Sequence, residues 1–208
     1  MFAAALSGFV LSLSLILAIG AQNSFVIRQG LLNQHVLAVV LFCSIADMVL
    51  ICLGVLGLGQ LLAPFFDLYR QWLFGLAALW LAGYGLLRFR DGLKMNTNTQ
   101  LDGVNLYRPA QTSLTQTLSV VAVLTFANPH VYLDTVILLG SLSVPYAGSY
   151  KLAFVCGASG ASLSFFAVLG FGVRRFSRYM TSRRAWQIID FATAFVMVFF
   201  AGLLISQT

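Results

Sequence analysis

The sequence predicts an all-α integral membrane protein with six transmembrane helices, arranged as a 3+3 inverted repeat with interrupted first and fourth helices. The 208-residue chain is 60% hydrophobic and 9% charged, whereas a soluble domain averages about 25% charged residues. Six apolar segments are each long enough to cross roughly 30 Å of hydrocarbon. A single polar stretch, residues 88–113, divides these segments into two groups of three.

The six predicted spans form one transmembrane domain over residues 1–208. Their expected ranges are 2–21, 36–62, 71–87, 114–142, 151–173 and 185–205. The first repeat covers about 1–87 and the second about 114–208, and the polar stretch between them is expected to be a cytoplasmic linker. Because each half has an odd number of spans, the two halves cross the membrane in opposite directions, as inverted repeats require.

The basic residues predict the orientation in the membrane. A net charge of +6 would suggest a nucleic-acid partner in a soluble protein, but here ten of the 12 basic residues lie in or beside three alternate loops. They are Arg28 in the first loop, Arg88, Arg90, Lys94 and Arg108 in the third, and Arg174, Arg175, Arg178, Arg183 and Arg184 in the fifth. Basic loops favour the cytoplasm, so both termini are expected outside. A five-span arrangement would separate the third and fifth loops, which the charges disfavour.

The fourth predicted span carries an unusual polar cluster: Asn128, Pro129, His130, Tyr132 and Asp134 lie within seven positions. Pro129 lacks a backbone donor and disfavours helix at Asn128, so the span is expected to break there. Asp134 then shares a helix face with His130. An unpaired carboxylate near the bilayer centre costs about 2.5–3.5 kcal/mol on insertion scales, which favours a functional site.

Further polar residues interrupt the first two spans. Asp47 in the second span is either a substrate or proton site, or a hydrogen-bonding residue that ties two helices together. Gln22 and Asn23 either belong to the site or mark the point where the first span meets water. His130 is a proton relay or a structural histidine, and Tyr132 contacts substrate or serves in packing.

Other residues in the spans are expected to serve packing. Asp190 is expected to pair with Arg183 and Arg184 at the membrane interface. Three serines of the fifth span either line the same cavity or bond helices together; they are Ser159, Ser162 and Ser164. Small residues four apart predict close helix packing; they are Ala153, Gly157 and Ala161. Three cysteines are expected to be apolar packing residues, with no metal site or cofactor; they are Cys43, Cys52 and Cys156.

Three stretches resemble the LysE family of bacterial amino-acid exporters, most closely its lysine/arginine branch. They are Gly-Ala-Gln-Asn-Ser-Phe-Val-Ile-Arg-Gln-Gly at 20–30, Ser-Ile-Ala-Asp at 44–47 and Asn-Pro-His-Val-Tyr-Leu-Asp-Thr at 128–135. The resemblance covers essentially the whole chain. It implies a cytoplasmic (inner) membrane protein that exports basic amino acids, and the family's membrane aspartates match Asp47 and Asp134. The family usually has Gly-Pro-Gln where this chain has Gly20-Ala21-Gln22, so the break in the first span must rest on Gly20 and the polar pair that follows.

We therefore expect a transporter, with an amino acid, protons and lipid as its partners and a homo-oligomer as an open possibility. Exporting one positive charge from a negative-inside cell costs about 2.3 kcal/mol per 100 mV, which exchange for a proton would offset. Asp47 and Asp134 are the residues expected to hold the substrate cation and the proton. The alternatives are an exporter of neutral amino acids or of another small cation, a structural membrane subunit, and an intramembrane aspartyl protease, whose usual Tyr-Asp and Gly-x-Gly-Asp contexts are absent from the sequence.

Overall fold

The computed structural model describes residues 1–17, 20–97, 112–176 and 183–206, and every regular element in these parts is helical. The α-helices are α1 (Phe2–Ile16), α2 (Ala21–Leu32), α3 (Val36–Leu53), α4 (Gly59–Thr97), α5 (Leu114–Phe126), α6 (Pro129–Tyr132), α7 (Leu139–Leu142), α8 (Ser149–Ala167) and α9 (Arg183–Ile205). Three π-helical segments accompany them: η1 (Gly54–Leu58), η2 (Leu133–Leu138) and η3 (Val168–Gly172). The all-α prediction is confirmed.

The helices are long and apolar enough for a multi-pass membrane protein. Four helical stretches each suffice to cross a bilayer, namely Val36–Leu58, Gln71–Leu93, Ser149–Gly172 and Gln187–Ile205. Two bent pairs give up to two more spans: α1 with α2, bent by 86°, and α5 with Pro129–Leu142, bent by 62°.

The predicted boundaries were wrong at three places, one of which is the loop expected at residues 63–70, because α4 begins at Gly59 and runs through it. Arg28, expected in a loop, lies in α2, which continues the first predicted span in a new direction. The third helix does not stop at residue 87 but runs as α4 to Thr97. The helix continues through the turn-forming pair Asp91-Gly92, and α9 supports this extension: the Gln187 side chain donates to the Gly92 carbonyl at 3.2 Å. The remainder of the predicted linker, residues 98–111, lies outside the described parts, as do Arg108 and Arg178.

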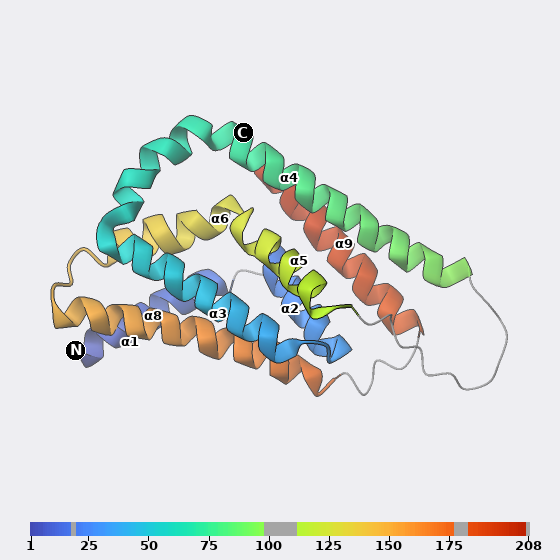
Figure 1. Ribbon diagram of the computed structural model, residues 1–208, viewed down its shortest axis with the longest axis horizontal. Helices are drawn as coiled ribbons and strands as arrows, with labels where there is room; N and C mark the ends of the chain where they lie inside the picture. The colour runs from blue at the N-terminus through green and yellow to red at the C-terminus, as the bar shows by residue number, and fades with distance from the viewer. Residues whose placement is uncertain (18–19, 98–111, 177–182, 207–208) are drawn as a thin grey trace.

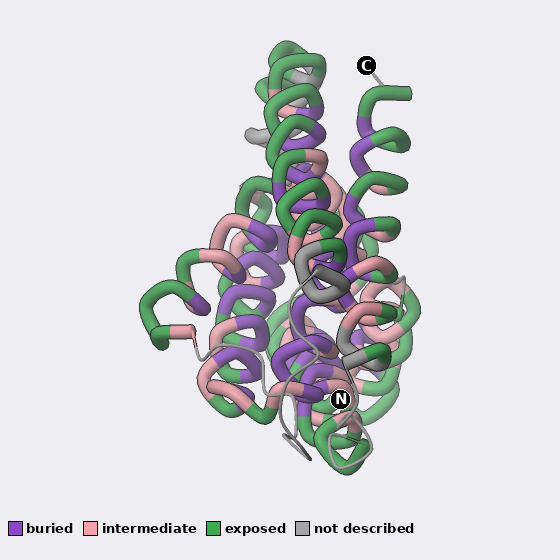
Figure 2. Tube along the Cα trace, turned by 90° about the vertical axis from the view of Figure 1, so that its right-hand side faces the viewer, coloured by how far each residue is buried: buried purple, intermediate pink, exposed green. Residues whose placement is uncertain are grey.

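The helices pack as long pairs around a buried centre (Figure 1). α4 runs along α9, α1 runs along α8, and α3 lies between α8 and α5. The largest buried apolar cluster joins α2, α3, α4, α5, α8 and α9, and Figure 2 shows buried residues on the faces that the helices turn toward one another. Large apolar side chains cover the outer surface, as expected of a protein surrounded by lipid.

Basic residues gather at one end of the molecule. The ends of α2, α4 and η3 and the starts of α3, α5 and α9 lie at this end, on the right of Figure 1, whereas α1 begins at the opposite end. Arg90, Arg174, Arg175 and Arg184 are exposed there.

Glycine allows α1 and α8 to approach more closely than any other residue would. A Cβ at Gly157 would overlap the Ala5 carbonyl, and one at Gly8 would overlap the Phe154 carbonyl. The expected close packing along the small residues of α8 is therefore confirmed at Gly157. Gly57 serves a turn instead: its φ of +93° lets the chain change direction between α3 and α4.

A buried ion pair joins α2 to α9. Arg28 Nε lies 3.2 Å from Asp190 Oδ1, and the two side chains are 7% and 0% exposed. We expected Asp190 to pair with Arg183 and Arg184, but its described partner is Arg28. The pair forms because α2 is a packed helix rather than a loop, which brings together two residues 162 positions apart.

Substituting Gly157 and Gly160 by alanine should shift stability in opposite directions. Gly157→Ala forces a methyl group against the α1 backbone and should destabilise the protein by about 1–3 kcal/mol. Gly160 has nothing within 4 Å of its Cβ position, so Gly160→Ala should raise stability slightly through its better helix propensity. Thermal melting in detergent measures both, and equal shifts would contradict the packing described above.

Removing Arg28 should harm the protein more than removing both partners of the pair. Arg28→Ala leaves a buried carboxylate without its cation, at a cost of roughly 3–5 kcal/mol. Replacing Arg28 and Asp190 together by leucine removes that penalty and should restore most of the melting temperature. Arg184→Ala, at an exposed site, is the control and should change little. If the double variant were as unstable as Arg28→Ala, the unpaired carboxylate of Asp190 would not be the cause of the lost stability.

Candidate functional site

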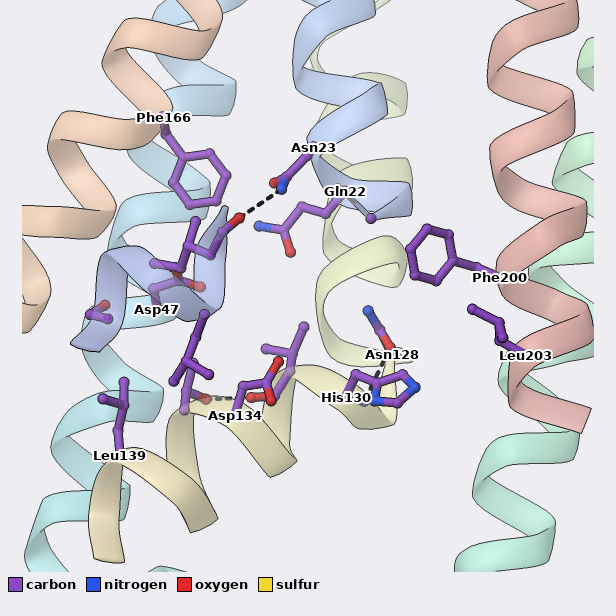
Figure 3. Close-up of a pocket in the computed structure, with 16 residues that line it drawn as sticks. Gln22, Asn23, Asp47, Asn128, His130, Asp134, Leu139, Phe166, Phe200 and Leu203 are labelled. Carbon is purple, nitrogen blue, oxygen red and sulfur yellow. Dashed lines mark hydrogen bonds between the residues drawn. The ribbon is translucent and has the colours of Figure 1, made fainter. Parts of the chain in front are cut away.

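A cavity of about 270 Å³ lies where the two bent pairs meet (Figure 3). Its volume falls just below the range typical of small-molecule pockets, about 300–1,000 Å³. Six of its lining residues were predicted as site residues, and they come from α2, α3 and the second break: Gln22, Asn23, Asp47, Asn128, His130 and Asp134. The fold therefore brings two distant carboxylates and several neutral polar groups to one space.

The first break is built around Gly20. This residue has an extended conformation (φ −113°, ψ −177°) and lines the cavity, and α2 begins directly after it. The Asn23 side chain reaches back across the break and donates to the Ile16 carbonyl at 3.0 Å, which satisfies one of the carbonyls freed at the end of α1. Gln22 and Asn23 are each only 7% exposed, so both side chains lie inside the protein.

The second break is built around Asn128 and Pro129. Pro129 is the first residue of α6, where its missing N–H costs no helical hydrogen bond. The Asn128 side chain caps the new helix by accepting from the His130 amide at 3.1 Å. Tyr132 does not line the cavity; its hydroxyl donates to the Phe126 carbonyl at 2.8 Å, so it bridges the break as Asn23 does at the first one.

Asp47 is almost fully buried, with 3% of its surface exposed. Its Oδ2 accepts from the Ser162 hydroxyl at 2.8 Å, which links α3 to α8. The carboxylate therefore ties two helices together, as expected of a structural hydrogen-bonding residue. It also lines the cavity, as a substrate or proton site would need. The three serines of α8 are not among the cavity's lining residues, and Ser164 is exposed.

Asp134 enters the cavity from the π-helical segment η2. Such segments change the direction of side chains within a helix and are frequent at functional sites. His130, four positions earlier in the chain, lines the same cavity. The His130 ring also packs edge-on against Phe74 of α4, with 5.7 Å between ring centroids.

The sequence analysis missed several lining residues. Ser12 of α1 lines the cavity with none of its surface exposed to solvent, and Phe166 of α8 and Phe200 and Leu203 of α9 supply apolar wall. Ser12 is one of three serines in the mostly apolar α1, and its proximity to the break at Gly20 is its only signal in the sequence.

The donor set suits a small polar cation better than a metal ion. Two carboxylates can hold positive charge, and the neutral amides can supply further hydrogen bonds. In the described parts of the chain, no three His, Cys, Asp or Glu side chains gather as metal ligands.

Comparisons with known proteins agree with this description. The family described as LysE type translocator matches residues 13–208. A candidate amino-acid transporter of Mycobacterium bovis is 37% identical over 186 residues, which is 89% of each chain. The lysine exporter LysE of Corynebacterium efficiens is 30% identical over 96% of each chain. The arginine exporter ArgO of Escherichia coli is 32% identical over 97% of this chain and 92% of its own length. No solved structure matches the chain. By its sequence, the protein belongs to the LysE family.

Proposed function

We propose that the protein is a secondary active exporter of basic L-amino acids, arginine or lysine or both, in the bacterial cytoplasmic membrane. The observation that carries the proposal is that Asp47 and Asp134 line one cavity between two bent spans. The names of its relatives support the cargo, since one is a lysine exporter and another an arginine exporter.

The two carboxylates hold the cationic groups of the substrate. A basic amino acid carries an α-ammonium and a side-chain cation, and each can pair with one acid. The guanidinium of arginine can bind a carboxylate through two parallel hydrogen bonds, whereas the ammonium of lysine binds as a point charge. The bond from Ser162 fixes the Asp47 carboxylate, so its orientation is set before the substrate arrives.

Proton exchange balances the charges in this proposal. When the cavity holds no substrate, at least one of the two acids holds a proton, because two ionised carboxylates in one small cavity within the membrane repel each other. The substrate cation displaces that proton. Export of one cation in return for one proton moves no net charge, so the membrane potential does not oppose the cycle.

In this proposal the cavity opens alternately to the two sides of the membrane. This alternating access relies on two inverted repeats, at about residues 1–87 and 114–208. Each half contains a bent first span, a helix that ends in a π-helical segment and a long third helix, which supports the repeat. The helices involved are α1–α2, α3–η1 and α4 in the first half and α5–α6, α8–η3 and α9 in the second. The basic end of the molecule faces the cytoplasm in this proposal, with both termini outside.

Neutralising either cavity acid should abolish exchange of arginine. Asp47→Asn and Asp134→Asn keep the side-chain volume but remove the charge, so arginine counterflow in proteoliposomes should fall at least tenfold, a loss expected for a charged contact. Asp91→Asn is the matched control, because Asp91 lies outside the cavity and its pairing with Arg88 is partly exposed. Normal arginine counterflow in both cavity variants would rule out the proposed role of the acids.

The cargo and the coupling can be tested together. Labelled arginine, lysine and leucine are compared in counterflow at zero potential, and then with a pH gradient imposed. Arginine or lysine should exchange, leucine should not, and an acidic exterior should accelerate the efflux of the basic amino acid. Exchange of leucine alone would favour the neutral amino-acid exporter instead, and rates independent of the gradient would exclude proton coupling.

A further inference from the structure

We infer that the start of α2, together with Ser12 and Gln22, is the subsite for the α-carboxylate of the substrate, so that the protein selects amino acids over the same cations without a carboxylate. This inference rests on the proposed function, since it requires a basic amino acid as cargo. It assigns roles to Ser12 and to one of the two broken helices in particular.

The helix α2 begins at the cavity. It has 12 residues, and its N-cap is Gly20, which has no side chain to cap it. The Ser24 N–H donates to the Gly20 carbonyl at 3.0 Å, and the amides before Ser24 have no acceptor within the helix itself. Gly20 lines the cavity, and nothing lies within 4 Å of its Cβ position. Such a helix start attracts an anion through its amides and its partial positive charge.

Two buried polar side chains beside this turn are incompletely paired. Ser12 Oγ makes no hydrogen bond, although Ser12 is 0% exposed. Gln22 is 7% exposed, and its side chain bonds to the thiol of Cys43, which is a weak acceptor. Both residues line the cavity. Buried polar groups in folded proteins are nearly always well paired, so an unpaired hydroxyl and a weakly paired amide at one cavity indicate a ligand that accepts hydrogen bonds.

The second break cannot play the same role. There Asn128 already caps the new helix by accepting from the His130 amide, and Asp134 follows one turn later. A carboxylate ligand at this break would meet a negative charge and an occupied donor. The two breaks therefore differ: the α2 side supplies donors, and the α6–η2 side supplies an acid.

The donors on the α2 side and the acid on the α6–η2 side determine the orientation of an amino acid bound in the cavity. In Figure 3, Gln22 enters the cavity from above and Asp134 from below, with Asp47 at one side. A substrate carboxylate at the start of α2 leaves the α-ammonium for one acid and the side-chain cation for the other. Agmatine, which is arginine without its carboxylate, would leave the donors of α2, Ser12 and Gln22 unsatisfied.

The test compares arginine, agmatine and arginine amide as competitors of labelled arginine in counterflow, and as ligands that raise the melting temperature of the purified protein. Agmatine and the amide should bind wild-type protein at least tenfold more weakly than arginine. Ser12→Ala and Gln22→Leu should each weaken arginine about tenfold, the effect of one hydrogen bond to a charged group, and leave agmatine unchanged. Gln22→Glu should weaken arginine further and retain agmatine, which also shows that the variant is folded.

Ser159→Ala is the matched control, because Ser159 is likewise buried with an unpaired hydroxyl but does not line the cavity. It should leave the binding of both ligands unchanged. The subsite would be overturned if arginine and agmatine competed equally, or if the Ser12 and Gln22 variants weakened the binding of both ligands equally. In either case, exchange of arginine by wild-type protein would still support the proposed function. If wild-type protein exchanges neither arginine nor lysine, the proposed function and the subsite both fail.

Discussion

A helix that breaks inside a bilayer frees backbone groups that lipid cannot satisfy, and the centre of this protein is organised around that constraint. Asn23 satisfies the Ile16 carbonyl across the first break, and Tyr132 satisfies the Phe126 carbonyl across the second. Asn128 caps the helix that restarts after the second break. Because these hydrogen bonds satisfy backbone groups at both breaks, polar groups can face a common interior space. Two carboxylates can lie there without contacting lipid tails.

The rest of the molecule holds that space in shape. Glycine contacts keep α1 against α8, and the bond between Asp47 and Ser162 keeps α3 against α8. The Arg28–Asp190 pair joins α2, which begins at the cavity, to α9, which contributes apolar wall to it. Both helices that this charge pair joins therefore contribute residues to the cavity.

Local signals in the sequence predicted the apolar spans, the polar interruption at Asn128–Pro129 and the two acids that line the cavity. They failed where the structure depends on distant contacts. From the sequence alone Arg28 resembles a loop residue. Its partner Asp190 lies in α9, 162 positions away, so no local pattern could reveal the pair. Ser12 carries no local signal besides its proximity to the first break, because a serine in an apolar helix is common. For Tyr132 the sequence left substrate contact and packing open, and its hydroxyl bonds to the backbone of the preceding helix.

The central claim is that the acids are tolerated in the membrane because a proton or a substrate cation neutralises them. Calorimetric titration of arginine into the purified protein, repeated in buffers of different ionisation enthalpy, counts the protons released on binding. By linkage, about one proton should be released per arginine bound to wild-type protein near neutral pH, and fewer when Asp47 or Asp134 is replaced by asparagine. Tight binding of arginine without proton release, in wild type and variants alike, would contradict the claim.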